Sequence, residues 1–203
     1  MATTAPPPPS QDIPALLAGA LRRSAAQLGD ARERWRHNGD RAHFTEAAPT
    51  DLAGVDLTAI DALRQPATPQ GWMLAAVRIT EDVRQIDRLI ASLQATPAPR
   101  SAAQCEQLVR LADLTGAEVE AAIDCLTRAD APLAQRTLDE EASLDQWYDH
   151  AVIELVEDRD GDGDTAEVLP ILAAIRSMER ISGHAQHVVA AWGAWTDIQR
   201  PSA

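Results

Sequence analysis

The chain has 203 residues, 45% of them hydrophobic and 24% charged, which is the balance of a globular protein and excludes a disordered one. Helix-forming residues dominate and the aromatic residues are five tryptophans, one tyrosine and one phenylalanine, so most sheet folds are excluded and an all-α fold is predicted. A net charge of −13 repels phosphate backbones and anionic lipids, which excludes general binding to nucleic acid or to membrane surfaces.

The first half of the chain begins with a Pro-rich lead-in over residues 1–11, which we expect to be disordered. Apolar residues then recur with a helical period from Ile13 to Trp35. A short second element is predicted around residues 51–63, and a longer helix over residues 70–93. The apolar stripe of that longer helix is predicted to be Leu74, Val77, Val83, Ile86, Leu89, Ile90 and Leu93.

Residues 94–101 carry two prolines within three positions and are the predicted linker, because proline cannot continue a helix. The helix after the linker has the stripe Leu108, Leu111, Thr115, Val119, Ala122 and Leu126. A second helix is predicted near residues 132–157, and a last one over residues 165–195 after an acidic loop. The stripe of the last helix is Ile171, Ile175, Met178, Ile181, Ala185, Val188, Trp192 and Trp195.

These elements predict two tandem three-helix bundles, the first over residues 12–95 and the second over residues 96–203. The two units have the pattern of a diverged repeat. Residues 83–86 (Val-Arg-Gln-Ile) align with residues 178–181 (Met-Glu-Arg-Ile) when the third helix is superposed on the last.

No apolar run approaches the ~20 residues that a bilayer span requires, so no direct membrane insertion is expected. The N-terminus lacks the basic start and apolar stretch of a secretion signal. Cys105 and Cys125 fall on one predicted helix, where a rise of ~1.5 Å per residue holds them about 30 Å apart and prevents a disulfide. A cytoplasmic location is therefore expected.

Two further patterns have ordinary structural explanations. The five tryptophans have the spacing of core and helix-end residues, which favours burial over a ligand site. Acidic residues on the helix after the linker are predicted to form a solvated face: Glu106, Asp113, Glu118, Glu120 and Asp124. Gly-rich phosphate loops and serine-nucleophile motifs are absent from the sequence, so no enzymatic activity is expected.

The acidic loop resembles the opening of a calcium-binding loop. Carboxylates stand at positions one, three, five and seven of the pattern, in Asp158, Asp160, Asp162 and Asp164, with glycine at position six. The closing glutamate is missing, because Leu169 stands at position twelve. The two interpretations left open are a weak calcium site and an interhelical loop whose Asp and Gly residues supply turns and a helix cap.

Histidines on the last two helices form a second candidate. His184 and His187 lie three residues apart, and His150 lies on the preceding helix. Imidazoles favour zinc or iron, so these side chains are candidate metal ligands. The alternative is that His184 packs or hydrogen-bonds and His187 is partly exposed.

Three segments combine into a recognisable pattern. Residues 178–185 are similar to the closing-helix motif leucine-glutamate-arginine-isoleucine-glycine-aspartate-histidine-alanine, and residues 141–148 are similar to a middle-helix acidic motif. Residues 64–66 and 75–83 resemble a glutamine-proline turn and its following helix. Over roughly residues 12–195 the chain thus resembles the PhoU family of bacterial phosphate-uptake regulators.

That resemblance implies carboxylates four residues apart on two helices of each bundle, facing a metal cluster. In the second unit Glu141, Asp145 and Glu179 match the motif, but Gly183 replaces an aspartate. With His184 as a substitute ligand, a weakened or altered site for a divalent, iron or zinc ion is expected there. No cofactor is expected to be required.

In the first unit the corresponding positions hold Arg84 and Arg88, whose guanidinium groups repel a cation. No metal is expected in the first bundle.

The resemblance implies a non-enzymatic cytoplasmic adaptor between the phosphate transporter's ATPase and a membrane sensor histidine kinase. An acidic surface suits this role because it steers basic partner surfaces. The alternative function is a metal- or calcium-binding helical bundle unrelated to phosphate signalling. The sequence leaves a homodimer open, and it does not identify the residues that contact a partner.

Overall fold

The computed structural model describes residues 12–37, 70–128, 136–137, 141–157 and 165–199. Within these ranges the long elements are all α-helices, which confirms the all-α prediction. They are α1 (Asp12–Arg36), α3 (Gln70–Ala95), α4 (Ala102–Arg128), α6 (Glu141–Glu157) and α7 (Thr165–Gln199). The Pro-rich lead-in, the predicted element at 51–63 and the acidic loop lie outside the described residues. No helix in the described ranges is long and apolar enough to cross a membrane.

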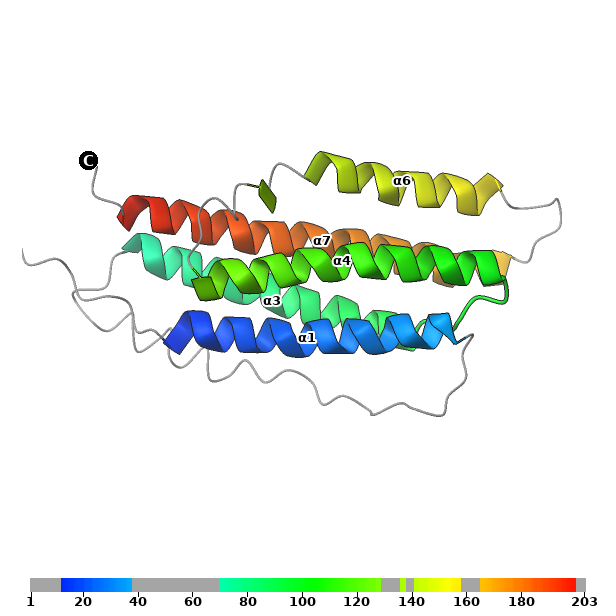
Figure 1. The fold of residues 1–203 in the computed structure, drawn as a ribbon, viewed down its shortest axis with the longest axis horizontal. Helices are drawn as coiled ribbons and strands as arrows, with labels where there is room; N and C mark the ends of the chain where they lie inside the picture. The colour runs from blue at the N-terminus through cyan, green and yellow to red at the C-terminus, as the bar shows by residue number, and fades with distance from the viewer. Residues whose placement is uncertain (1–11, 38–69, 129–135, 138–140, 158–164, 200–203) are drawn as a thin grey trace, which may run out of the picture.

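The five helices lie side by side along the long axis of the molecule (Figure 1). Their most extensive contacts join α1 to α4 and α3 to α7, so each described helix of the first half packs against a helix of the second. Further contacts join α4 to α7 and α1 to α3. α6 lies at one edge of this arrangement, where it packs on α7 and less extensively on α4.

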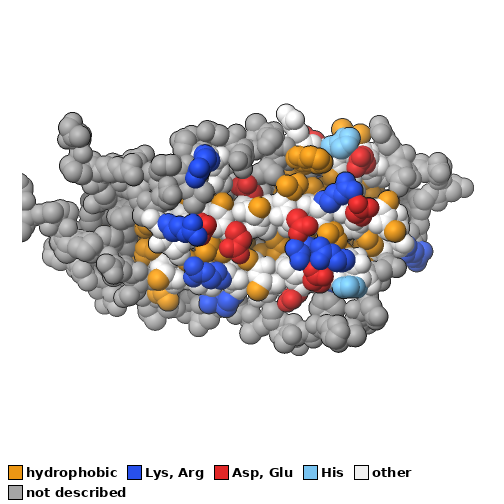
Figure 2. Space-filling view, in the orientation of Figure 1, with side chains coloured by type: hydrophobic (Ala, Val, Ile, Leu, Met, Phe, Trp, Pro, Cys, Tyr) orange, Lys and Arg blue, Asp and Glu red, His pale blue; other side chains and the backbone are white. Residues whose placement is uncertain are grey.

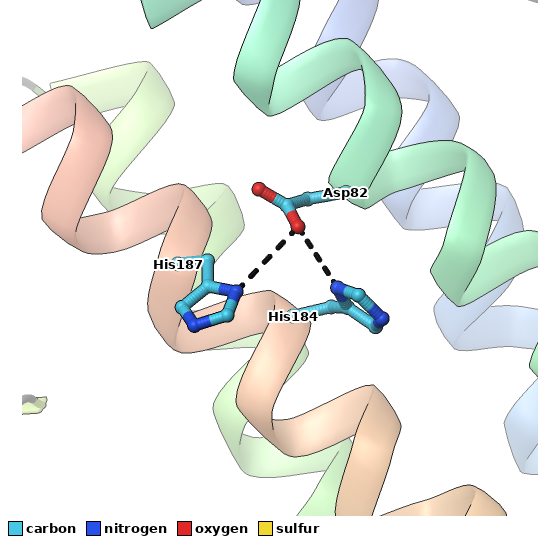
Figure 3. Close-up of side chains that lie close together, drawn as sticks. All are labelled: Asp82, His184 and His187. Atoms are coloured by element: carbon cyan, nitrogen blue, oxygen red, sulfur yellow. Dashed lines mark hydrogen bonds and ion pairs between the residues drawn. The ribbon is translucent and has the colours of Figure 1, made fainter.

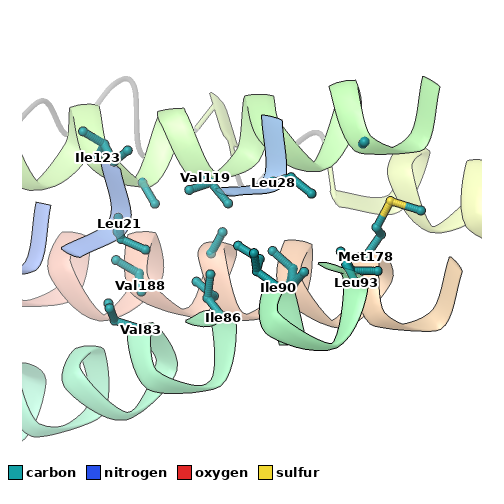
Figure 4. Close-up of a cluster of buried hydrophobic side chains, with 14 of the residues drawn as sticks. Leu21, Leu28, Val83, Ile86, Ile90, Leu93, Val119, Ile123, Met178 and Val188 are labelled. Carbon is teal, nitrogen blue, oxygen red and sulfur yellow. The ribbon is translucent and has the colours of Figure 1, made fainter. Parts of the chain in front are cut away.

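The described helices of both halves bury their apolar stripes in one continuous core (Figure 4). The core side chains that meet there include Leu21, Leu28, Val83, Ile86, Ile90, Leu93, Val119, Ile123, Met178 and Val188. Burying an aliphatic side chain of this size contributes about 1.5–3 kcal/mol. This burial holds the first half of the chain against the second.

The predicted stripes of α4 and α7 are confirmed, with Trp195 alone not described. The stripe of α3 is corrected at its start, because Leu74 and Val77 are 68% and 53% exposed. The buried face begins instead with Ala76 and Ile79. These residues precede Val83 at helical intervals of seven and four, and so lie on its side of the helix.

Two other expectations are corrected. Trp147 on α6 is 54% exposed rather than buried, whereas Trp35 and Trp192 lie in the core as predicted. Glu118 on α4 is buried rather than solvated. It follows Thr115 by three residues, and therefore shares the face that α4 turns toward its neighbours.

The linker between α3 and α4 is fixed at both of its ends. The guanidinium of Arg34 on α1 donates to the carbonyls of Leu93, at 3.0 Å, and of Gln94, which are among the last acceptors of α3. Beyond the linker, the thiol of Cys105 donates to the carbonyl of Pro99 at 3.3 Å. Cys105 and Cys125 both lie on α4 and form no disulfide, as predicted, and both side chains are buried.

Candidate functional site

One carboxylate and two imidazoles meet at the surface between α3 and α7 (Figure 3). The Nδ1 atom of His184 lies 2.8 Å from Oδ1 of Asp82, and Nδ1 of His187 lies 3.6 Å from the same oxygen. One ligand atom from each residue lies within 4.8 Å of the other two. Among the described residues, these three side chains are the ones that lie close enough together to hold a metal ion.

Helical geometry accounts for this arrangement. His184 and His187 are three residues apart on α7 and therefore project from one face, with their rings edge to face at 5.9 Å between centroids. Asp82 precedes the fully buried Val83 on α3, which places it at the margin of the α3–α7 interface. The Asp82 and His184 side chains are 17% and 22% exposed, and His187 is 69% exposed. The group is therefore open to solvent on one side.

The acidic residues predicted as ligands in the second half do not form such a group where they are described. Asp145 is exposed on α6. Glu179 on α7 accepts a hydrogen bond of 2.6 Å from Arg176, which also lies 3.7 Å from Asp149. The side chain of Glu141 lies outside the described residues, so the predicted four-residue site stays a prediction.

Gly183 leaves open space at the fourth position of the predicted acidic site. A Cβ atom added there would have no side chain or neighbouring helix of the described residues within 4 Å. The aspartate of the family motif would therefore fit sterically. The chain therefore lacks a carboxylate at this position although there is room for one.

The two arginines that replace carboxylates in the first half lie beside one glutamate. Arg88 lies 2.8 Å and Arg84 3.7 Å from the carboxylate of Glu81 on the same helix. Positive charge thus occupies the face of α3 on which the resemblance implies metal-binding carboxylates.

The calcium-loop candidates Asp158, Asp160, Asp162 and Asp164 lie outside the described residues, and calcium binding there stays a prediction.

A polar cluster is buried where α6 meets α4. The hydroxyl oxygens of Tyr148 and Thr115 are 2.8 Å apart, and Thr115 donates to the carbonyl of Leu111 at 2.7 Å. Because the Thr115 proton is used in that second bond, Tyr148 is the donor in the first. Burial raises the pKa of Tyr148, and the charge of the nearby Glu118 raises it further.

An open groove of about 1090 Å³ runs between α4 and α6. Its apolar lining includes Leu111, Leu114, Trp147, Ala151 and Leu155, and its charged lining is Glu106, Arg110, Asp113, His150 and Glu154. Two of the charged residues form ion pairs with arginine or carboxylate partners: Arg110 with Glu106 at 2.5 Å and Asp113 with Arg32 at 2.6 Å. His150 lies 3.1 Å from Glu154. Figure 2 shows apolar side chains exposed between such charged pairs on this face.

The sequence indicated only part of these sites. The spacing of His184 and His187 indicated that these two residues lie together, but nothing near Asp82 in the sequence marks it as their partner. The sequence gives no indication of the groove, because the spacing of the tryptophans favours burial. No local pattern marks the groove, because the burial of Tyr148 and the exposure of Trp147 beside it depend on how α6 packs against its neighbours.

Comparisons with known proteins agree with the resemblance predicted from the sequence. The family model of the PhoU domain matches residues 108–191. Among solved structures, the fold is similar to the crystal structure of PhoU from Pseudomonas aeruginosa, with a TM-score of 0.58, 20% sequence identity and 93% of each chain covered. A search of curated proteins found no match. At this identity the structural likeness establishes the fold alone.

Proposed function

The chain carries a PhoU domain, and on that premise we propose that it is a non-enzymatic regulator of phosphate uptake and of phosphate-starvation signalling. The match over residues 108–191 is the observation that carries the proposal. The proposed regulator works in the cytoplasm as an adaptor between the ATPase of the phosphate transporter and a sensor histidine kinase.

The packing of the helices supports a tandem repeat in this adaptor. α1 lies against α4 and α3 against α7, and these are the corresponding helices of the two predicted units. We propose that residues 12–95 and 96–203 are two three-helix units of PhoU type, related by this pairing. The part of the first unit at 51–63 is included on the sequence pattern alone.

We propose the groove between α4 and α6 as the surface that receives a helical segment of the partner. Its lining combines an apolar floor and the exposed Trp147 with three carboxylates against one guanidinium. An amphipathic segment with apolar and basic side chains complements both features. The net charge of −13 favours approach of such a basic segment.

Affinity capture of the tagged full chain from phosphate-replete and phosphate-starved cells tests the adaptor role. Mild crosslinking before capture and mass spectrometry afterwards identify the partners. The expected result is recovery of the phosphate-transporter ATPase or of a sensor histidine kinase. Recovery of neither protein in either condition would overturn the adaptor proposal.

Substitutions at two exposed apolar residues of α6 provide a variant and a matched control that test the groove. Trp147→Ala removes the largest exposed side chain in its lining, whereas Ile153→Ala changes a residue that is 51% exposed and lies outside that lining. We expect Trp147→Ala to reduce recovery of the partner and Ile153→Ala to leave it unchanged. Equal recovery with both variants would exclude the groove and leave the adaptor role intact.

The alternative function is a metal- or calcium-binding helical bundle without a phosphate role. The observation that favours it is the Asp82, His184 and His187 group. For calcium, the candidate ligands are the four aspartates at 158–164, and titration calorimetry with calcium chloride on the wild type and on Asp160→Asn tests them. Heat that is lost in the variant would support the loop, and no heat at millimolar calcium would exclude it.

A further inference from the structure

We propose that Asp82, His184 and His187 bind one divalent transition-metal ion, such as Zn²⁺, that links α3 to α7. The three residues come from both halves of the chain, and their ligand atoms already lie within 4.8 Å of one another. This inference does not depend on a role in phosphate signalling.

The distances between the ligand atoms suit tetrahedral coordination. Bonds of about 2.0–2.1 Å from zinc to nitrogen or oxygen place neighbouring ligand atoms of a tetrahedron about 3.3 Å apart. The observed separations from Oδ1 of Asp82 are 2.8 Å to His184 and 3.6 Å to His187. One nitrogen of each imidazole lies within 4.8 Å of one on the other ring. Rotations of the three side chains that bring all of these separations to about 3.3 Å would admit the ion.

The donor set selects the class of ion. Two imidazole nitrogens and one carboxylate oxygen are typical ligands of Zn²⁺ and related transition metals, whereas Ca²⁺ and Mg²⁺ prefer sets made of oxygen alone. Three protein ligands leave the fourth tetrahedral position open. Since His187 is 69% exposed, water has access to that position.

A purely structural ion pair explains only part of this geometry. The 2.8 Å contact between His184 and Asp82 is sufficient by itself to join α3 to α7. His187 adds little to such a pair, because it is largely exposed and 3.6 Å from the oxygen. Yet its Nδ1 is turned toward the same carboxylate oxygen, as the close-up shows (Figure 3). Both rings thus place a nitrogen beside one carboxylate oxygen, and rotations of the three side chains would turn these donor atoms toward a shared ion.

The site differs from the acidic site that the family resemblance implies. Glu179 is engaged by Arg176, and Asp145 is exposed on α6. Neither belongs to the Asp82 group. The two sites share His184, but mutation of Glu179 affects only the acidic site and mutation of Asp82 or His187 affects only the proposed one.

Binding of an ion at this place stabilises the packing of the two halves. α3 belongs to the first half and α7 to the second, and their interface is among the most extensive in the molecule. An ion that binds the folded state alone raises stability by RT ln(1 + [L]/Kd). The melting temperature should therefore rise with zinc concentration.

The test is titration of ZnCl₂ into metal-free full-length protein by calorimetry, together with thermal melts. We expect the wild type to bind one ion per chain and to melt at a higher temperature with zinc. His187→Ala is the main variant, because an exposed side chain can be removed without loss of the fold. We expect it and Asp82→Asn to weaken binding at least tenfold and to abolish the thermal shift.

Two controls locate the ion. His150→Ala removes an exposed histidine that lies 3.1 Å from Glu154 on the same helix, and it should leave zinc affinity unchanged. Glu179→Gln alters the acidic site and should also leave it unchanged. With Co²⁺ in place of Zn²⁺, an intense visible absorption band reports tetrahedral coordination, and His187→Ala should lose this band.

Three results would overturn the proposal. One is the absence of zinc binding by the wild type. Another is a zinc affinity equal to that of the wild type in the His187→Ala and Asp82→Asn proteins, when both are folded in the presence of a chelator. The last is loss of binding in Glu179→Gln but not in His187→Ala, which would place the ion at the acidic site instead.

Discussion

The phenol oxygen of Tyr148 on α6 lies 2.8 Å from the hydroxyl of Thr115 on α4, inside the protein. α6 is the least extensively packed of the described helices, and this hydrogen bond is a buried polar link between it and the rest of the bundle. The same helix carries Trp147 on its exposed side. Tyr148 therefore anchors one wall of the groove that we propose for partner binding.

Replacing Tyr148 with phenylalanine should weaken this anchor. The variant removes the donor to Thr115 and keeps the ring, so we expect the free energy of unfolding to fall by about 1–2 kcal/mol. Denaturant unfolding followed by circular dichroism measures the change. Trp147→Phe is the control at the neighbouring exposed position, and it should stay within about 0.5 kcal/mol of the wild type. A Tyr148→Phe protein as stable as the wild type would show that the hydrogen bond contributes nothing.

Stability should also fall at high pH. Burial raises the pKa of Tyr148 above its ordinary value of 10.0, so the folded state keeps the phenol proton where the unfolded state releases it. The contribution is complete below the unfolded pKa and is lost as pH rises toward the folded pKa, because the unfolded state then binds fewer protons.

The sequence makes this pH dependence unusually easy to measure. Tyr148 is the single tyrosine, so phenolate absorbance reports this residue alone. The chain has no lysine, so no lysine amine titrates in the same pH range. We expect native protein at a pH of about 10.5 to show less phenolate than denatured protein. Burial also raises the pKa of Cys105, with the same sign, so Tyr148→Phe is compared at each pH to isolate the tyrosine. Identical titration curves for native and denatured protein would contradict the prediction.

The corrected stripe of α3 leads to a matched pair of core and surface variants. Ile86→Ala removes a fully buried side chain from the shared core and should cost about 2–5 kcal/mol in the free energy of unfolding. Leu74→Ala changes a residue that is 68% exposed and should cost less than about 0.5 kcal/mol. Chemical denaturation of both variants tests the assignment. Similar losses of unfolding free energy in the two variants would show that Leu74 belongs to the buried stripe.

Gly183 provides a test of the open space at the predicted acidic site. It lies within α7, where glycine is unfavourable, and a Cβ there has room. We expect Gly183→Ala to raise the free energy of unfolding by about 0.5–1 kcal/mol. Gly116→Ala on α4 has equal room and should give a similar gain. Destabilisation by Gly183→Ala alone would show that the glycine is required there for close packing.

The helices and most of their buried faces could be predicted from the amino-acid sequence. Apolar residues at intervals of three and four are a local property, so the stripes of α4 and α7 could be assigned before any packing was known. The resemblance to PhoU also rested on short local motifs. The same reasoning failed for Glu118, Leu74 and Trp147, because periodicity gives the angle between side chains on one helix but not which sector a neighbouring helix covers.

Which helix faces meet depends on how the two halves of the chain pack together. Asp82 and His184 are 102 residues apart, and they touch because α3 packs on α7. Nothing local to either residue encodes that contact, since it depends on the apolar stripes of both halves being buried in one core. For the same reason the groove could not be foreseen, because it arises where α6 packs less closely on α4 than the other helices do on one another.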